Sequence, residues 1–229
     1  MIHLARNPAS VWEAAYLRFQ TREQEVRRSL RRLRRMGADR WPRNARVAEL
    51  FCGSGGGLEA LERIGFSDVV GVDRSPSLLA EYRGPFECVA SDCRELDAIG
   101  NGSKDLLIVQ GGLHHLERLR DDLPRMLREA WRVLSTNGLL AVIEPWSTPF
   151  LSFAHAVCGS AWARRASRKV DALAAMIEQE GETYRTWLAS PAFILESLDE
   201  RFETTWSRVA WGKRLSVSRR RPIPIEGGR

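Results

Sequence analysis

Residues 46–73 read RVAELFCGSGGGLEALERIGFSDVVGVD, and the order of residue types in this segment predicts the fold. A short apolar run, Val47 to Phe51, carries a carboxylate at Glu49 in its interior. Four glycines follow within five positions, at Gly53, Gly55, Gly56 and Gly57. A helical pattern of apolar residues then leads into a second apolar run, which ends in Asp73. Strand, glycine-rich loop, helix, strand and acidic residue together predict a nucleotide- or nucleoside-binding βαβ unit.

After residue 73 the predicted strands and helices alternate, and from residue 146 onward this alternation stops. We expect strands at 86–90, 106–109 and 139–143, helices from Pro76 and over 121–134, and a turn at Asn137-Gly138. Helical patterns in 146–190 interrupt the alternation as an insertion, and a helix over 191–198 and two strands at 202–211 and 214–218 follow. Such alternation predicts a mostly parallel sheet.

Composition limits the class of protein. With 229 residues, 44% of them hydrophobic, we expect one α/β domain with an appendage, or two small domains. No run of about 18 apolar residues occurs, so we expect no transmembrane helix. Arg6 and Glu13 interrupt the segment where a signal peptide would need an apolar core. The four cysteines form no CxxC pair, which indicates neither a disulfide framework nor a zinc site and favours the cytoplasm.

The N-terminal segment, 8–36, is predicted to be one or two helices. Thr21 and Gln24 have the spacing of a helix cap, and Gly37 is expected to end the helix. Arginines surround a narrow apolar seam here, and the whole chain carries a net charge of +6 with only three lysines among 35 basic residues. This face is either a footprint for RNA, a lipid headgroup or an acidic substrate, or a solvated helix surface.

The carboxyl ends of parallel strands meet at one edge of a sheet, where ligands bind. The predicted strand ends that converge there are 53–57, Asp73, Asp92, 110–115 and 144–146. Gly55, Gly57 and Ala60 satisfy the dinucleotide pattern G-x-G-x-x-A, so a nicotinamide oxidoreductase is one alternative. Glu49 argues against it, because a carboxylate inside the strand would repel a pyrophosphate but suits a cationic amino-acid ligand.

Five segments in register resemble the motifs of class I S-adenosylmethionine-dependent methyltransferases. They are VAELFCGSGGG (47–57), VVGVDRSPSLL (69–79), ASDCREL (90–96), DLLIVQGGLHHL (105–116) and LREAWRVLSTNGLLAVIEP (127–145). The resemblance implies a three-layer α/β/α sandwich around a Rossmann-like, seven-stranded, mostly parallel sheet with an antiparallel last strand. It also implies a helical cap over 1–40, a methyltransferase domain over 41–218 with a substrate lid at 146–190, and a flexible tail over 219–229.

The resemblance further implies S-adenosylmethionine as cofactor, S-adenosylhomocysteine as product, and no metal. The implied cofactor-binding residues are Glu49, Cys52, Gly53, Ser54, Gly55, Asp73, Arg74, Asp92, Cys93 and Gln110. Glu49 and Gln110 would lie on the methionine side, Asp73 would accept the ribose hydroxyls, and Asp92 would border the adenine. The sequence departs from the family pattern at Phe51, which replaces the first glycine, and at Gln110, where Asp or Asn is more frequent.

Methyl transfer is an in-line displacement, so the enzyme has to position a nucleophile, and a hydroxyl nucleophile also needs a base. His114 and His115 are candidates for this base because histidine titrates near neutrality. His115 could instead cap or pack against the next helix. Glu144, at the predicted tip of the fifth strand, is the second catalytic candidate.

The substrate is expected to contact the N-terminal helix and the insertion. The candidate substrate-binding residues are Tyr16, Phe19, Trp146, Phe150 and Trp187. No N-P-P-Y tetrapeptide follows the fourth strand, which favours a small-molecule or lipid-like acceptor methylated on oxygen. The alternatives are an RNA or protein methyltransferase that uses the arginine-rich helix, and a non-catalytic cofactor-binding subunit. We expect a monomer or homodimer, with peripheral membrane contact left open.

Overall fold

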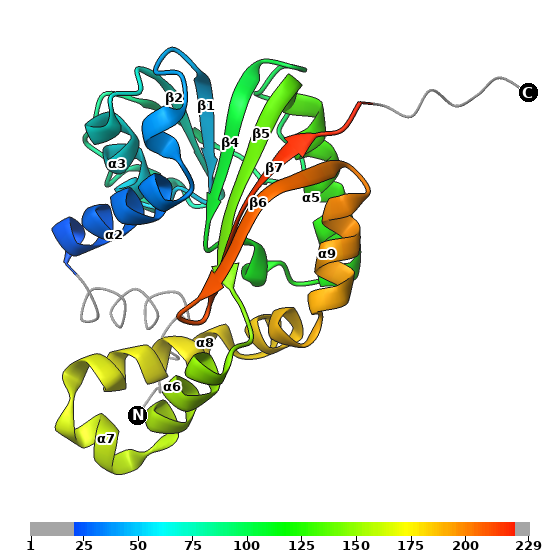
Figure 1. Ribbon diagram of the computed structural model, residues 1–229. Coiled ribbons are helices and arrows are strands. Elements are labelled where there is room, and N and C mark those ends of the chain that lie inside the picture. Colours follow the sequence, from blue (N-terminus) through cyan, green and yellow to red (C-terminus); the bar gives the residue numbers. More distant parts are fainter. Residues whose placement is uncertain (1–20, 223–229) are drawn as a thin grey trace, which may run out of the picture.

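A seven-stranded sheet organises the residues that the computed structural model describes, 21–222. Its strands lie in the order β3-β2-β1-β4-β5-β7-β6 (Figure 1). They are β1 (Arg46–Leu50), β2 (Asp68–Asp73), β3 (Glu87–Ala90), β4 (Lys104–Gln110), β5 (Leu134–Pro145), β6 (Phe202–Ala210) and β7 (Lys213–Arg220). The first five strands pair in parallel, and β7 runs antiparallel to both β5 and β6. The predicted sheet with an antiparallel last strand is confirmed.

Helices cover both faces of the sheet. They are α2 (Arg22–Arg35), α3 (Gly56–Ile64), α4 (Pro76–Leu79), α5 (Leu119–Val133), α6 (Pro149–Gly159), α7 (Ala161–Ala166), α8 (Arg168–Ala189) and α9 (Pro191–Asp199), with 3-10 turns η1 (Ala38–Arg40) and η2 (Leu113–His115). Figure 1 shows α2 and α3 on one side of the sheet and α5 and α9 on the other. The predicted three layers are therefore present.

Strand β1 shows how alternating side chains build the two cores. Ala48 and Leu50 are fully buried in the core on the α5 side, together with Leu123. Val47 is fully buried in the core on the α3 side, with Leu61 of that helix. Successive side chains of a strand point to opposite faces, so Glu49 belongs to the same face as Val47. This alternation places the Glu49 carboxyl on the α3 side of the sheet.

Helix α2 begins and ends as its sequence predicts. The Thr21 hydroxyl accepts a hydrogen bond from the Gln24 amide while the Gln24 side chain accepts one from the Thr21 amide. Such a reciprocal cap contributes about 1 kcal/mol. The helix ends at Gly37, whose φ of 96° is in the left-handed region. The predicted helical segment before Thr21 lies outside the described residues.

The later strands differ from the prediction in two places. Strand β7 continues to Arg220, two residues into the predicted tail, because the Arg220 guanidinium donates to the Leu134 carbonyl (2.8 Å) and stacks 3.8 Å from the Trp131 ring centre. The predicted turn at Asn137-Gly138 lies inside β5, where the register with β4 shifts. The tail from residue 223 onward lies outside the described residues.

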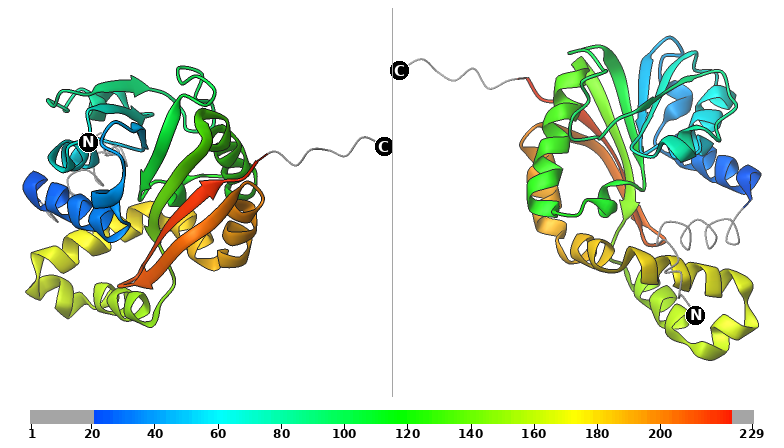
Figure 2. Two further views of the ribbon diagram at one scale, coloured as in Figure 1. Left: turned by 45° about the horizontal axis from the view of Figure 1, so that its top comes forward. Right: turned by 180° about the vertical axis from the view of Figure 1, so that it is seen from behind.

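The insertion after β5 forms α6, α7 and α8, and it lies beyond the carboxyl ends of the parallel strands (Figures 1 and 2). Helix α8 kinks at Gly181, whose φ is 43°. Beyond the kink, the Trp187 indole donates to the Pro145 carbonyl at 2.8 Å, which fixes this part of α8 to the tip of β5. No helix among residues 21–222 is long and apolar enough to cross a membrane.

Candidate active site

The glycine-rich loop connects β1 to α3 by backbone that a larger residue could not follow. Gly53 and Gly55 have φ of 53° and 91°. A Cβ at Gly55 would lie 2.3 Å from a ring carbon of Tyr82. The structure thus explains why glycine is required at position 55, and it brings the loop close to the tip of β2.

Glu49 and Gln110 meet at the ends of the neighbouring strands β1 and β4. The Gln110 amide donates to Glu49 Oε1 at 2.9 Å. The other carboxylate oxygen of Glu49 and the amide oxygen of Gln110 are buried and have no hydrogen-bond partner among the described residues. Buried acceptors without donors are costly, so the pair is suited to a ligand that brings N–H groups.

The environment of Glu49 also changes its acidity. Its side chain is 2% exposed, and burial raises the pKa of its carboxyl to about 8, although the Gln110 hydrogen bond opposes this shift. The carboxyl fits only because position 57 is glycine, where a Cβ would lie 1.8 Å from Glu49 Oε1. At neutral pH the free protein therefore holds this carboxyl mainly in its protonated form.

Asp73 at the tip of β2 organises two backbone segments. Its carboxylate accepts hydrogen bonds from the Gly53 amide at 2.9 Å and from the Ser75 amide at 2.8 Å. Each carboxylate oxygen can accept a second bond, so the group could also receive ligand hydroxyls. Its neighbour Arg74 is exposed at the same strand end.

Asp92 forms an ion pair with Arg94 that the sequence analysis did not predict. Arg94 donates to both of its carboxylate oxygens, at 2.9 and 2.7 Å, and reaches Asp122 at 2.9 Å. These hydrogen bonds lower the pKa of Asp92 to about 2, against an opposing effect of burial. Asp92 thus belongs to an ionic network that joins the β3 end to α5, and a ligand would share it with Arg94.

The two cysteines predicted beside the cofactor point into the protein cores. Cys93 packs in the core on the α5 side and Cys52 in the core on the α3 side. Burial raises the pKa of both thiols, that of Cys93 to about 12. Their side chains are therefore packing groups, and only their backbone borders the strand ends.

His114 and Glu144 form a buried pair, which the sequence presented only as two separate candidates. His114 Nδ1 lies 2.7 Å from Glu144 Oε2, and the side chains are 6% and 2% exposed. Glu144 Oε1 accepts from the backbone amides of Gly112 and Leu113, both at 2.8 Å. Burial opposes ionisation of Glu144, but His114 and the Leu113 amide outweigh it, so the pKa of this carboxyl is lowered. An ionised Glu144 can orient the imidazole.

The insertion extends this pair with two further side chains. The Tyr184 ring of α8 meets the His114 ring edge-on at 5.8 Å, and the Tyr184 hydroxyl lies 3.2 Å from His155 Nε2 of α6. Burial lowers the pKa of His155. His115 is exposed, and its ring centre lies 4.1 Å from that of His114. A sequence reading could not find this chain of contacts, because Tyr184 and His155 are far from His114 in sequence.

Arg22 on α2 contacts the glycine-rich loop, and the sequence analysis did not predict this contact. Its guanidinium donates to the Ser54 carbonyl at 2.8 Å, to the Ser54 hydroxyl at 3.0 Å and to Glu59 at 2.7 Å. Ser54, predicted to touch the cofactor, is thus also the point where α2 is fixed to the glycine-rich loop.

The described substrate-binding candidates lie in different environments. Trp187 is 2% exposed and its indole is hydrogen-bonded to the Pro145 carbonyl, so its role in substrate binding stays a prediction. The Arg214 guanidinium lies over the Trp146 ring, 5.6 Å from the centre of that ring. Phe150 is 45% exposed and packs edge-on against Trp211 at 5.1 Å. Tyr16 and Phe19 lie outside the described residues.

Comparisons with known proteins agree with this geometry. A profile of the methyltransferase domain matches residues 48–142, which contain Glu49, Asp73, Gln110 and His114. Residues 48–142 are thus similar to a methyltransferase domain, and the strand order of the described sheet is the one expected for class I S-adenosylmethionine-dependent methyltransferases. Both findings favour that family over the dinucleotide alternative. No group of His, Cys, Asp and Glu side chains that could hold a metal ion occurs in the described part of the chain.

Solved structures share the methyltransferase fold at low sequence identity. The PH0226 protein from Pyrococcus horikoshii OT3 has a TM-score of 0.63 at 18% identity, covering 86% of this chain and 92% of that one. A putative S-adenosyl-L-methionine-dependent methyltransferase from Methanococcus maripaludis has a TM-score of 0.61 at 13% identity, covering 98% and 99%. A TehB-like methyltransferase from Corynebacterium glutamicum has a TM-score of 0.59 at 18% identity, covering 94% and 100%. No curated protein sequence matches this chain.

Phe51 and Gly112 give a stability prediction. Phe51 replaces the family's first glycine yet keeps a left-handed φ of 57°, and a Cβ at Gly112 would lie 2.1 Å from its ring. Gly112→Ala should therefore lower the free energy of unfolding by about 1–3 kcal/mol, as overpacking does. Adding Phe51→Gly should restore much of this loss by removing the clash. Urea denaturation of both single variants and the double variant measures the coupling, and additive effects would contradict the contact.

Glu49 gives a pH prediction for the free protein. The carboxyl titrates near 4.5 when unfolded and near 8 when folded, so the folded state binds more protons between these values. The free energy of unfolding should therefore decline as pH rises from 5 to 8, by a few kcal/mol at most. Glu49→Gln should remove this decline, which urea denaturation at pH 5, 6.5 and 8 would show. Equal pH profiles for the two proteins would contradict the raised pKa.

Proposed function

We propose that this methyltransferase transfers the methyl group of S-adenosylmethionine to oxygen of a small-molecule or lipid-like acceptor, with His114 as general base. The observation that carries the proposal is the buried Glu144–His114 pair. Glu144 lies near the end of β5 and His114 lies within η2, and β5 is hydrogen-bonded to β4, whose end carries Gln110. The candidate base and the candidate cofactor contacts thus occupy neighbouring strand ends.

The residues at the strand ends fit the cofactor chemically. The orphaned oxygens of Glu49 and Gln110 are two acceptors that the ammonium of the methionine moiety would satisfy. Asp73 would accept the ribose hydroxyls while retaining its bonds to Gly53 and Ser75. Arg74 would lie beside the adenine, and Asp92 would contact the adenine amine only by sharing its carboxylate with Arg94. S-adenosylmethionine, when bound, supplies an electrophilic methyl group on a sulfonium.

His114 would act on the acceptor through Nε2. Its Nδ1 is held by Glu144, which fixes the ring and stabilises the imidazolium that forms when Nε2 takes the proton of an acceptor hydroxyl. Two backbone amides hold Glu144 itself in place. The base is buried with Tyr184 of the insertion against it, which would limit access of water to the proton transfer. We further propose that 146–190 serves as the substrate lid.

The base assignment predicts a sharp difference between the two histidines. His114→Asn can keep a hydrogen bond to Glu144 but cannot take a proton, so it should slow methyl transfer by about 10²–10⁴-fold. His115→Asn is the matched control and should stay within about threefold, because its ring is exposed whereas that of His114 is buried. Transfer is measured with methyl-labelled cofactor and a metabolite extract, and calorimetry checks that both variants bind the cofactor. Equal rates for His114→Asn and the parent protein would contradict the base assignment.

The arginine-rich surface of α2 supports one second candidate, RNA methylation. Arginines crowd one surface of this helix. RNA binding through phosphates would weaken steeply with salt. A labelled methyl group recovered in RNA rather than in the metabolite fraction would favour this candidate.

A further inference from the structure

In the described part of the chain, all exposed large apolar side chains belong to two segments, 150–162 and 206–211. The most exposed of them are Phe153 of α6, Trp162 of α7 and Trp211 between β6 and β7, at 67%, 79% and 72%. Figures 1 and 2 show α6, α7 and the turn between β6 and β7 at one end of the molecule, beyond the carboxyl ends of the parallel strands. Aromatic side chains gathered in this way indicate an interaction surface.

Helix α6 and the turn between β6 and β7 form a continuous part of this surface. The Phe150 ring meets the Trp211 ring edge-on at 5.1 Å. The Gly212 carbonyl accepts a hydrogen bond from the Trp146 amide at 2.9 Å, which fixes the turn to the segment that leads into α6. Phe153 follows Phe150 by about one helical turn, so both rings lie on the same side of α6. We call Phe150, Phe153 and Trp211 the aromatic surface.

Trp211 occupies a turn position that does not favour tryptophan. Ala210 and Lys213 are paired across the hairpin, so Trp211 and Gly212 form a two-residue turn, with φ of 53° and 71°. A turn with two positive φ angles favours Asn-Gly, and a bulky residue is rarely left-handed. The stability of the hairpin therefore does not explain a tryptophan at this position, whereas a role for its exposed ring does.

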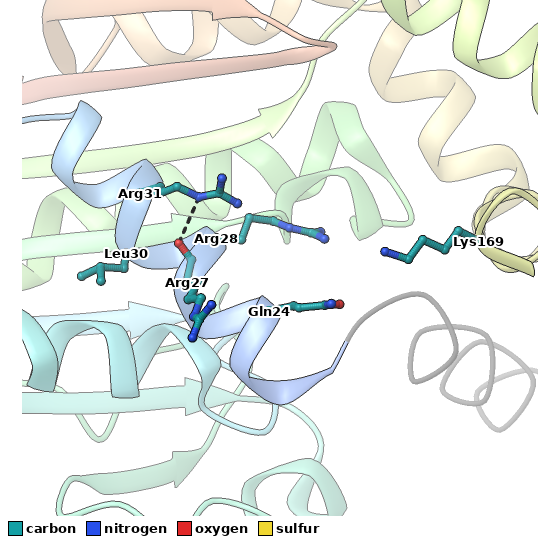
Figure 3. Close-up of a pocket in the computed structure, with 6 residues that line it drawn as sticks. All are labelled: Gln24, Arg27, Arg28, Leu30, Arg31 and Lys169. Atoms are coloured by element: carbon teal, nitrogen blue, oxygen red, sulfur yellow. Dashed lines mark hydrogen bonds between the residues drawn. The ribbon is translucent and has the colours of Figure 1, made fainter.

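The segments that carry the aromatic surface contain no acidic residue. Neither 147–170 nor 206–214 includes Asp or Glu, although the whole chain has 29 of them. Two basic residues of the first segment are directed toward other parts of the protein. Arg164 pairs with Asp171 of α8 at 3.1 Å, and Lys169 extends toward α2 across a pocket of about 490 Å³ (Figure 3). The charge beside the aromatic surface therefore has to come from other residues.

Arg165 and Arg208 supply this charge. Both side chains are exposed, and neither forms an ion pair with another described residue. Arg165 lies three residues after Trp162 in α7, so the two share one side of that helix. Arg208 lies in β6, three residues before Trp211. Aromatic rings next to cations suit the boundary between anionic lipid headgroups and acyl chains, where the rings leave water and the cations meet phosphates.

We infer that the aromatic surface docks on an anionic phospholipid bilayer, with Phe153 and Trp211 inserted at the headgroup boundary. The inference concerns where the protein binds and does not rest on the proposed function. A second copy of the chain fits less well, because a two-fold contact sets the same surface against itself. It would bring Arg165 and Arg208 toward the same cations of the other copy, with no acidic residue in these segments to pair with them. Lipid phosphates supply the opposite charge.

The turn allows a variant that removes the ring and keeps the fold. Trp211→Asn gives the turn the sequence that its backbone favours, so the free energy of unfolding should not fall. Sedimentation with vesicles of phosphatidylcholine and phosphatidylglycerol should become at least about tenfold weaker, because a large apolar contact with lipid is lost. Trp206→Thr is the matched control, because it removes an exposed tryptophan from β6 away from the turn. It should bind the vesicles within about twofold of the parent protein.

A second pair of variants tests the charges. Arg165→Gln with Arg208→Gln should weaken binding to the anionic vesicles at least about tenfold, because each removes a cation near the lipid phosphates. Arg128→Gln with Arg219→Gln loses the same charge from exposed positions toward the amino ends of the parallel strands. This control should stay within about twofold of the parent protein.

Failure of the parent protein to sediment with the anionic vesicles would overturn the inference. Equal binding by Trp211→Asn and the parent would do the same, because it assigns the lipid contact to another part of the chain. A dimer of the parent protein in analytical ultracentrifugation that Trp211→Asn abolishes, without any binding to vesicles, would assign the surface to a second copy instead. Affinity for S-adenosylmethionine, measured separately, reports on the proposed function and not on this surface.

Discussion

The buried carboxyl of Glu49 is the constraint on which the rest of the site depends. A carboxylate inside a central parallel strand is costly, because burial opposes its ionisation. The chain accommodates it with glycine at position 57, where any Cβ would collide with it, and with Gln110 as a single donor. The second carboxyl oxygen of Glu49 and the amide oxygen of Gln110 have no partner among the described residues. These two free acceptors indicate a ligand with N–H donors. The glycine-rich loop is thus shaped by the carboxyl beneath it as well as by its own turn.

The pKa of the second buried carboxyl, that of Glu144, is shifted in the opposite direction to that of Glu49. Two backbone amides and His114 stabilise its charged form, so the pKa of this carboxyl is lowered although it is equally buried. Two acids on one sheet edge therefore have different charges near neutral pH: Glu49 is mainly protonated and Glu144 ionised. This difference separates the proposed binding role of one from the proposed orienting role of the other.

The sequence predicted much of the fold because its signals are local. Runs of apolar residues predicted β1, β2 and β4. The polar residues in or at the ends of these strands, Glu49, Asp73 and Gln110, could therefore be predicted as site residues, as could Glu144. What it could not predict depends on contacts between distant segments. Nothing in the local pattern pairs Arg22 with Ser54, Arg94 with Asp122, or Tyr184 with His155. The hydrogen bond from the Trp187 indole to Pro145 was likewise not foreseen, because aromatic spacing in an insertion does not distinguish an anchor from a pocket wall.

If Glu49 and Gln110 hold the ammonium of S-adenosylmethionine, as proposed, then binding of the cofactor should release a proton. At pH 7 the Glu49 carboxyl, with a pKa of about 8, is mostly protonated in the free protein, and an adjacent ammonium would ionise it. Calorimetry of cofactor binding in buffers with different ionisation enthalpies should show release of nearly one proton. Glu49→Gln should bind more weakly and release almost none. Binding of the cofactor by both proteins with the same proton count would contradict the account.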